Sequence, residues 1–116
     1  MREVKLTDKP GIYLMAQIIR NLEDNQSFYA IKVGKSSNLR KRVNSYKGMN
    51  PGCICIDIME CQDYDRREKI FQEKIIEFGG YLCAGGREWF SIPKENFDKV
   101  LEKGLNAVYN LERKYG

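Results

Sequence analysis

The residues of this chain best suited to chemistry are cations that follow a glycine. The stretch from Lys35 to Lys47 contains five cations and no acid. The formal net charge of the 116-residue chain is only +4, so the residues outside this stretch are net negative by one. Positive charge concentrated on one segment is typical of a surface that binds a phosphate backbone.

Two of these cations are expected to meet at one anion. Lys35 follows Gly34 at the end of a predicted strand, and Arg42 lies on the border of the apolar stripe of the next predicted helix. The other three cations are interpreted with equal weight as contacts to nucleic acid or as a solvated helix face: Arg40, Lys41 and Lys47.

A carboxylate on a predicted core face is the next candidate. Glu68 follows a 3-4-3 spacing with Phe71, Ile75 and Phe78, so it shares the helix stripe that must face the core. A carboxylate there needs a partner such as a cation or a metal ion. The alternative is a capping box from Asp65 to Glu68, in which Glu68 only bonds a free amide at the helix start.

Several kinds of site are excluded by composition. The chain has no histidine, which removes serine–histidine catalysis and imidazole zinc sites. Cys53 and Cys55 are separated by one residue, which is not the two-residue gap of a common zinc motif. In an intracellular protein these two residues, with Cys61 and Cys83, are interpreted as reduced thiols. A zinc site that uses all four cysteines is the lesser alternative. Tyr13, taken alone, is interpreted as a packed aromatic of the first strand.

The spacing of apolar residues predicts the elements that position these side chains. Strands are expected over about 11–19, 29–33 and 53–59, with a hairpin between the first two and a short extended segment at 88–92. Helices are expected after a Ser36 or Ser37 cap, from Asp63 or Asp65 to about 78, and over 93–115. This order predicts an α+β fold with a small antiparallel three-stranded sheet flanked by helices.

The third strand and the whole chain carry further expectations. Alternation places Ile54, Ile56 and Ile58 on one strand face and the cysteines on the other. Residues 1–116 are expected to form a single domain that ends in an amphipathic helix over 93–115, through which a homodimer could form. No signal peptide or membrane span is recognised, so an intracellular, cytoplasmic protein is expected.

Three motifs together resemble the GIY-YIG nuclease superfamily. They are Gly11-Ile12-Tyr13, Lys32-Val33-Gly34 with Arg42 eight positions after its glycine, and a helical Glu68. The stretch 33–46 looks especially like the N-terminal nuclease domain of the bacterial excision-repair incision subunit. Glu88-Trp89-Phe90 looks like the phage-type branch of the superfamily, often labelled a DNA-binding domain. The resemblance covers about residues 11–92.

The resemblance implies a nuclease cleft over a three-stranded antiparallel sheet. Glu68 would hold one divalent metal ion, Mg²⁺ or Mn²⁺, and Tyr13 would assist the attacking water as general base or relay. Arg42 and Lys35 would bind the scissile phosphate. A metal ion and cations aimed at a phosphorane-like transition state supply electrostatic stabilisation where charge develops.

The leading hypothesis is a small metal-dependent endonuclease that hydrolyses phosphodiester bonds in DNA, with RNA left open as a substrate. Lys32 stands where the superfamily has tyrosine, and no asparagine after Glu68 precedes Trp89. The alternative is therefore a catalytically weakened GIY-YIG-like module that binds nucleic acid. In both hypotheses four cations contact nucleic acid: Lys32, Arg40, Lys41 and Lys47. A protein-interaction domain that uses the helix over 93–115 is a third hypothesis.

Overall fold

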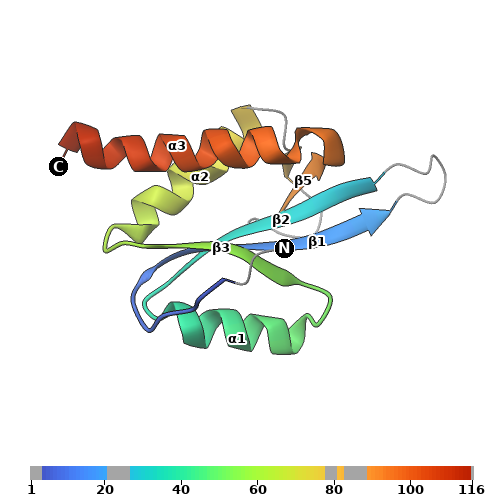
Figure 1. Ribbon diagram of the computed structural model, residues 1–116, viewed down its shortest axis with the longest axis horizontal. Helices are drawn as coiled ribbons and strands as arrows, with labels where there is room; N and C mark the ends of the chain where they lie inside the picture. Colours follow the sequence, from blue (N-terminus) through green and yellow to red (C-terminus); the bar gives the residue numbers. More distant parts are fainter. Residues whose placement is uncertain (1–3, 21–26, 78–80, 83–88, 116) are drawn as a thin grey trace.

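The computed structural model describes residues 4–20, 27–77, 81–82 and 89–115, and Figure 1 shows its elements in chain order. The strands are β1 (Gly11–Arg20), β2 (Ser27–Ser36), β3 (Ile54–Glu60), β4 (Tyr81–Leu82) and β5 (Trp89–Pro93). The helices are α1 (Leu39–Met49), α2 (Tyr64–Glu77) and α3 (Phe97–Tyr115), with a 3-10 turn, Lys94–Asn96, before α3.

The strands form one antiparallel sheet in the order β3-β1-β2-β5-β4. The predicted α+β class and the hairpin of β1 with β2 are confirmed, and the hairpin pairs Gly11 with Ser36 at its open end. The predicted count of three strands is wrong, because β5 pairs with β2 and β4 pairs with β5. The sequence shows that 88–92 is extended, but it does not show which strand this segment pairs with.

The sheet separates two apolar cores. In Figure 1, α1 lies on one face, while α2 and α3 cover the other. Residues of β1 alternate between the cores: Ile12 and Leu14 pack toward α2 and α3, whereas Tyr13 and Met15 pack against α1. Adjacent residues at the start of β1 can therefore take part in sites on opposite faces.

The predicted alternation in β3 is wrong at one end. Opposite β3, Leu14 pairs with Asp57 but Met15 pairs with Cys55, so Ile56 is the extra residue of a β-bulge. Ile56 packs on the α2 and α3 side, whereas Ile58 packs on the α1 side. A bulge changes the face of every residue beyond it, and simple alternation cannot detect it.

The helix starts differ from the prediction by a few residues. Asn38, rather than Ser36 or Ser37, caps α1: its side chain accepts a hydrogen bond from the Lys41 amide at 3.0 Å. Ser36 accepts instead from the Asn38 amide at 3.0 Å, which fixes the turn before the cap. The last helix begins at Phe97, because the 3-10 turn separates it from the proline that was expected to open it.

The apolar side of α3 packs within this chain. Val100 and Val108 of α3 are buried in the core that α3 shares with α2. Three further residues of the predicted stripe are partly buried against this core: Phe97, Leu101 and Leu105. This packing leaves the predicted homodimer without support from the described part of α3. Of the helices described, none has the length and apolar character needed to cross a bilayer.

Candidate active site at the end of β2

Tyr13 and Arg42 meet across a strand glycine. Tyr13 on β1 pairs with Gly34 on β2, and a Cβ atom added to Gly34 would lie 2.2 Å from the tyrosine Cζ. Only glycine therefore leaves room for the ring. The tyrosine is 1% exposed, and its hydroxyl oxygen accepts a hydrogen bond from Arg42 Nε at 3.2 Å. Arg42 itself is exposed on α1, so it connects a buried hydroxyl with the surface.

The first motif glycine has a separate packing role. A Cβ atom on Gly11 would lie 2.1 Å from the Met59 carbonyl oxygen on β3. The close approach of β1 and β3 therefore requires glycine at this position. Both motif glycines are thus explained by the close packing of β1 against its two neighbours, β3 and β2.

Lys35 and Glu68 meet on the opposite face of the sheet. Residues Ile31 and Val33 of β2 face α2, and Lys35 continues this alternation at the end of the strand. Its ammonium group lies 3.9 Å from Glu68 Oε1 and forms a shorter ion pair with Asp65 Oδ1. Two carboxylates of α2 therefore share one lysine.

The position of Glu68 decides between the two predictions made for it. The Arg67 amide donates to the Asp63 carbonyl at 3.1 Å, so α2 has begun before Asp65 and the capping box with Glu68 does not form. Glu68 is 8% exposed and shares its buried stripe with Phe71 and Ile75, as the spacing predicted. The expected fourth stripe residue, 78, lies outside the described residues.

Two further side chains hold α2 in place. Gln72, one turn after Glu68, donates from Nε2 to the Val33 carbonyl of β2 at 3.2 Å. Arg67 is buried, donates to Asp63 Oδ1 at 2.7 Å, and lies 3.6 Å from the sulfur of Met59 on β3. Sequence reasoning missed both roles, although the four-residue spacing of Asp63 and Arg67 is typical of a helical ion pair.

The four predicted site residues come from four elements that meet near the end of β2. Arg42 and Tyr13 lie on the α1 side of the sheet, and Lys35 and Glu68 lie on the α2 side. The two pairs are linked through the β2 backbone, in which Gly34, the partner of Tyr13, is followed directly by Lys35. Asp65 joins this group, although the sequence indicated only a capping role for it. Its three-residue spacing from Glu68 is the signal that could have identified it, because such residues share a helix face.

The other cations have different surroundings. Lys32 is only 7% exposed, and its Nζ lies 4.5 Å from the ring centroid of Tyr46, a geometry that suits packing better than the expected contact with nucleic acid. Arg40 bonds Asp8 at 2.9 Å and the Leu6 carbonyl at 3.1 Å, which ties α1 to the preceding segment. Two predicted nucleic-acid contacts remain as exposed cations of α1: Lys41 and Lys47.

The donor groups fit a metal ion that completes its shell with water and phosphate. Asp65 and Glu68 provide two carboxylates, and Mg²⁺ is commonly held by one or two carboxylates together with substrate phosphate. Within the described ranges, no three Cys, Asp or Glu side chains form a cage for a metal ion. The site therefore fits Mg²⁺ or Mn²⁺ only in this open form.

The described cysteines do not gather with other possible ligands into a group that could hold a metal ion. Burial raises the pKa of Cys53, and it raises the pKa of Cys55 to about 11, so both thiols stay protonated near neutral pH. Cys83 lies outside the described residues. Because no group of three possible ligands forms among the described residues, the described cysteines give no support to the four-cysteine alternative.

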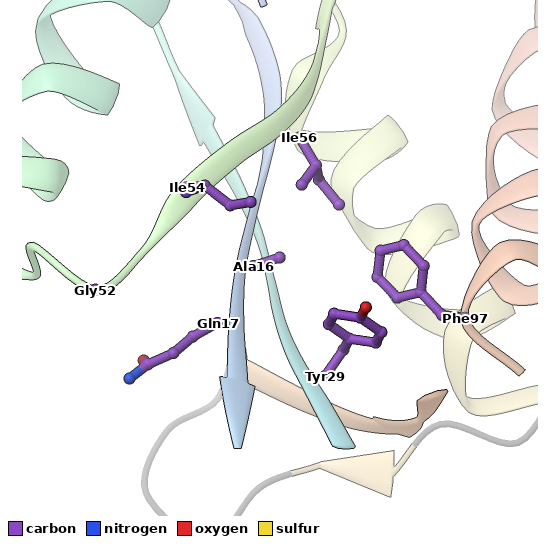
Figure 2. A pocket seen from close by; sticks show the side chains of 7 residues that line it. All are labelled: Ala16, Gln17, Tyr29, Gly52, Ile54, Ile56 and Phe97. Atoms are coloured by element: carbon purple, nitrogen blue, oxygen red, sulfur yellow. The ribbon is translucent and has the colours of Figure 1, made fainter. Parts of the chain in front are cut away.

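An apolar pocket of about 390 Å³ lies toward the other end of the strands (Figure 2). The rings of Tyr29 and Phe97 lie against each other on one side of it, with centroids 4.3 Å apart. None of the described residues that line it is a Lys, Arg, Asp or Glu, so the described lining does not suit a phosphate. The lining residues are Ala16, Gln17, Tyr29, Gly52, Ile54, Ile56 and Phe97.

Comparison with known proteins gives a family for the chain. Residues 12–104 match the T5orf172 domain. No match was found among curated proteins or among solved structures. The matched range includes both pairs described above, Tyr13 with Arg42 and Lys35 with Glu68. Because it spans most of the 116 residues, the chain belongs to the T5orf172 domain family.

Proposed function

We propose that this chain is a small, divalent-metal-dependent endonuclease that hydrolyses phosphodiester bonds in DNA through a GIY-YIG-type site. The observation that carries the proposal is the arrangement at the end of β2, where Tyr13 and Arg42 lie on one side and Lys35 and Glu68 on the other. The T5orf172 domain is found in phage-type and homing-endonuclease-like proteins, which supports a nuclease.

Two cations would bind and orient the scissile phosphate. Arg42 is exposed and presents a planar guanidinium, which suits bidentate bonding to phosphate oxygens. Lys35 adds a second positive charge from the neighbouring strand end. Together they would stabilise the negative charge that develops on the phosphate oxygens during attack by water.

Tyr13 would assist the attacking water. Its oxygen accepts from Arg42 and has a second lone pair that can accept from the attacking water, while its O–H can donate to a phosphate oxygen. Water would attack phosphorus and pass a proton to the Tyr13 oxygen while the Tyr13 O–H proton moves to a phosphate oxygen. One ester P–O bond would break, and the leaving alkoxide would take a proton from solvent. The burial of Tyr13 fixes the direction of its hydroxyl before substrate arrives.

Glu68 would hold Mg²⁺ or Mn²⁺ on the α2 side of the site. When bound, such an ion polarises phosphate oxygens and stabilises the leaving oxygen. The burial of Glu68 restricts its rotamers, so the carboxylate is held in one orientation.

The second candidate function is a GIY-YIG-like module that binds DNA without cleaving it. The buried position of Lys32 favours this alternative, because Lys32 replaces a tyrosine of the superfamily and packs on Tyr46. The exposed cations of α1 would then provide contacts to the phosphate backbone.

Incubation of the purified chain with supercoiled plasmid and single-stranded DNA separates the two functions. The endonuclease predicts nicked or shortened DNA with Mg²⁺ or Mn²⁺ and intact DNA with EDTA. Intact DNA under all metal conditions, together with a gel shift, would establish the binding module instead. Single-stranded RNA in a parallel reaction tests the choice of nucleic acid.

A further inference from the structure

We propose that Lys35 and the divalent metal ion compete for Asp65 and Glu68, so that metal binding releases the Lys35 ammonium group toward the scissile phosphate. Asp65 then becomes a second metal ligand beside Glu68. This inference rests on the proposed function for the identity of the metal ion, but metal binding without DNA can test it.

The ion pairs show a cation already seated at the two carboxylates. The Lys35 ammonium group pairs with Asp65 Oδ1 and lies 3.9 Å from Glu68 Oε1. Glu68 is largely buried, and a buried carboxylate requires a nearby positive charge or hydrogen bonds to stay ionised. In the metal-free chain, the positive charge of Lys35 therefore compensates part of the negative charge of the two carboxylates. A bound metal ion would provide this compensation instead.

The lysine and the metal ion cannot both occupy this position. Mg²⁺ binds carboxylate oxygens at about 2.0–2.1 Å, closer than an ammonium group approaches them. An ion bound to Asp65 and Glu68 would lie within a few ångströms of Lys35 Nζ, where like charges repel. Binding of the ion therefore expels the ammonium group.

The exchange needs only a side-chain rotation. The Lys35 side chain is 41% exposed and that of Asp65 is 76% exposed, so both can change rotamer without disturbing the core. The hydrogen bond of Gln72 to the Val33 carbonyl meanwhile keeps α2 against β2. Asp65 and Glu68, three residues apart, stay on one side of the helix and can bind one ion together.

Released from Asp65, Lys35 is placed to act on the phosphate. It follows Gly34, which packs against Tyr13, and Tyr13 bonds Arg42. A lysine stem is long and flexible, so its ammonium group can turn from the α2 side toward a phosphate at the strand end. The exchange couples metal loading to the release of a phosphate-binding cation.

Mn²⁺ titration of the full chain without DNA, followed by calorimetry or electron paramagnetic resonance, tests the exchange. Lys35→Met should bind Mn²⁺ about tenfold more tightly than the wild type, because it removes the competing charge. The matched control is Lys69→Met, which removes an exposed lysine of α2, the helix that carries Asp65 and Glu68, and should change the affinity little. Lys35→Gln repeats the test with a polar side chain.

The role of Asp65 as a metal ligand is tested in the Lys35→Met background, because that variant lacks the ion pair between Lys35 and Asp65. Adding Asp65→Asn should then weaken Mn²⁺ binding about tenfold, as expected for loss of a carboxylate ligand. Adding Glu73→Gln instead removes an exposed carboxylate of α2 and should have little effect.

Each outcome decides the inference separately from the endonuclease. An unchanged Mn²⁺ affinity in Lys35→Met, or an unchanged affinity on adding Asp65→Asn, overturns the exchange even if DNA is cleaved. No Mn²⁺ binding in any variant also overturns it. The predicted changes in affinity without DNA cleavage would support the exchange and contradict the endonuclease. Circular dichroism of every variant confirms that the fold is kept.

Discussion

The hydrogen bond from Arg42 to Tyr13 joins an exposed cation to a hydroxyl in the core. The arginine can therefore contact phosphate at the surface and orient the tyrosine at the same time. A lysine at position 42 would lack the Nε–H donor and the planar fork. Another positively charged residue at position 42 would therefore not replace arginine in both contacts.

Arg42→Ala is expected to lower the DNA cleavage rate by about 10²–10³-fold, because it removes a donor aimed at developing charge. Arg42→Lys should recover little of this loss. Single-turnover cleavage at saturating protein measures the effect. The matched control is Lys41→Ala, which removes an exposed neighbouring cation and should weaken DNA binding without changing the cleavage rate at saturating protein. Equal cleavage rates for the Arg42→Ala and Lys41→Ala variants would show that Arg42 has no special role in cleavage.

Gly34→Ala is expected to destabilise the chain by about 3 kcal/mol, because the added methyl group would overlap the Tyr13 ring in a packed core. Gly48→Ala is the matched control: a Cβ atom there meets nothing within 4 Å, and alanine should stabilise α1 by about 0.5–1 kcal/mol. Urea denaturation followed by circular dichroism measures both changes. A Gly34→Ala variant as stable as the wild type would contradict the packing described here.

The candidate site residues were named from the sequence in different ways. Chemistry and spacing indicated Lys35 and Arg42 and left two interpretations for Glu68, whereas the role of Tyr13 came from the family resemblance. The structure places the four residues as two pairs. The burial of Lys32 against Tyr46 was not predictable, because it depends on how α1 packs across the sheet.

At the scale of elements, α2 carries the acidic half of the site and is fixed from two sides. Gln72 bonds the backbone of β2, and Phe71 packs beneath α3 next to Gly104. A shift of α2 would move Glu68 away from the end of β2. Helix packing therefore determines the position of the carboxylate.

Gly104→Ala tests this packing. Alanine favours a helix, yet here its Cβ atom would lie 2.9 Å from the ring of Phe71, which is buried and cannot move away freely. We expect a net loss of about 1–3 kcal/mol in the free energy of unfolding, from overpacking between α2 and α3. Thermal and urea denaturation measure it, and addition of Phe71→Leu should restore part of the loss. A gain in stability like that expected for Gly48→Ala would show that the two helices are loosely packed.

The elements themselves were largely predictable, but their pairing was not. Apolar spacing predicted the β1 and β2 hairpin and all three α-helices to within a few residues. The bulge at Ile56 and the pairing of β5 with β2 depend on contacts between segments far apart in sequence. Local patterns contain no information on such pairings.

At the scale of the whole molecule, the cations between Lys35 and Lys47 do not act alike. Lys35 pairs with α2, Arg40 pairs with Asp8, and Arg42 bonds Tyr13. Lys41 and Lys47 are exposed on α1, which makes that helix the expected contact for the phosphate backbone. Binding of DNA should therefore depend strongly on salt.

Lys41→Ala and Lys47→Ala should each weaken DNA binding and reduce the slope of log affinity against log salt concentration by about 1. Arg40→Ala should change the slope less and lower stability by roughly 0.2–1 kcal/mol, because Arg40 is held by Asp8. Fluorescence anisotropy with a labelled duplex at several salt concentrations measures the slopes. Affinity independent of salt would contradict a phosphate-backbone contact by α1.

The rate of DNA cleavage by Glu68→Gln, compared with Glu73→Gln, tests the central claim most directly. Both variants neutralise one carboxylate of α2, but only Glu68 is buried next to Lys35. With Mg²⁺ we expect Glu68→Gln to cleave plasmid about 10²-fold more slowly or worse while it still folds and binds DNA, and Glu73→Gln to cleave like the wild type. Equal cleavage by the two variants, or intact plasmid with the wild type, would contradict the account.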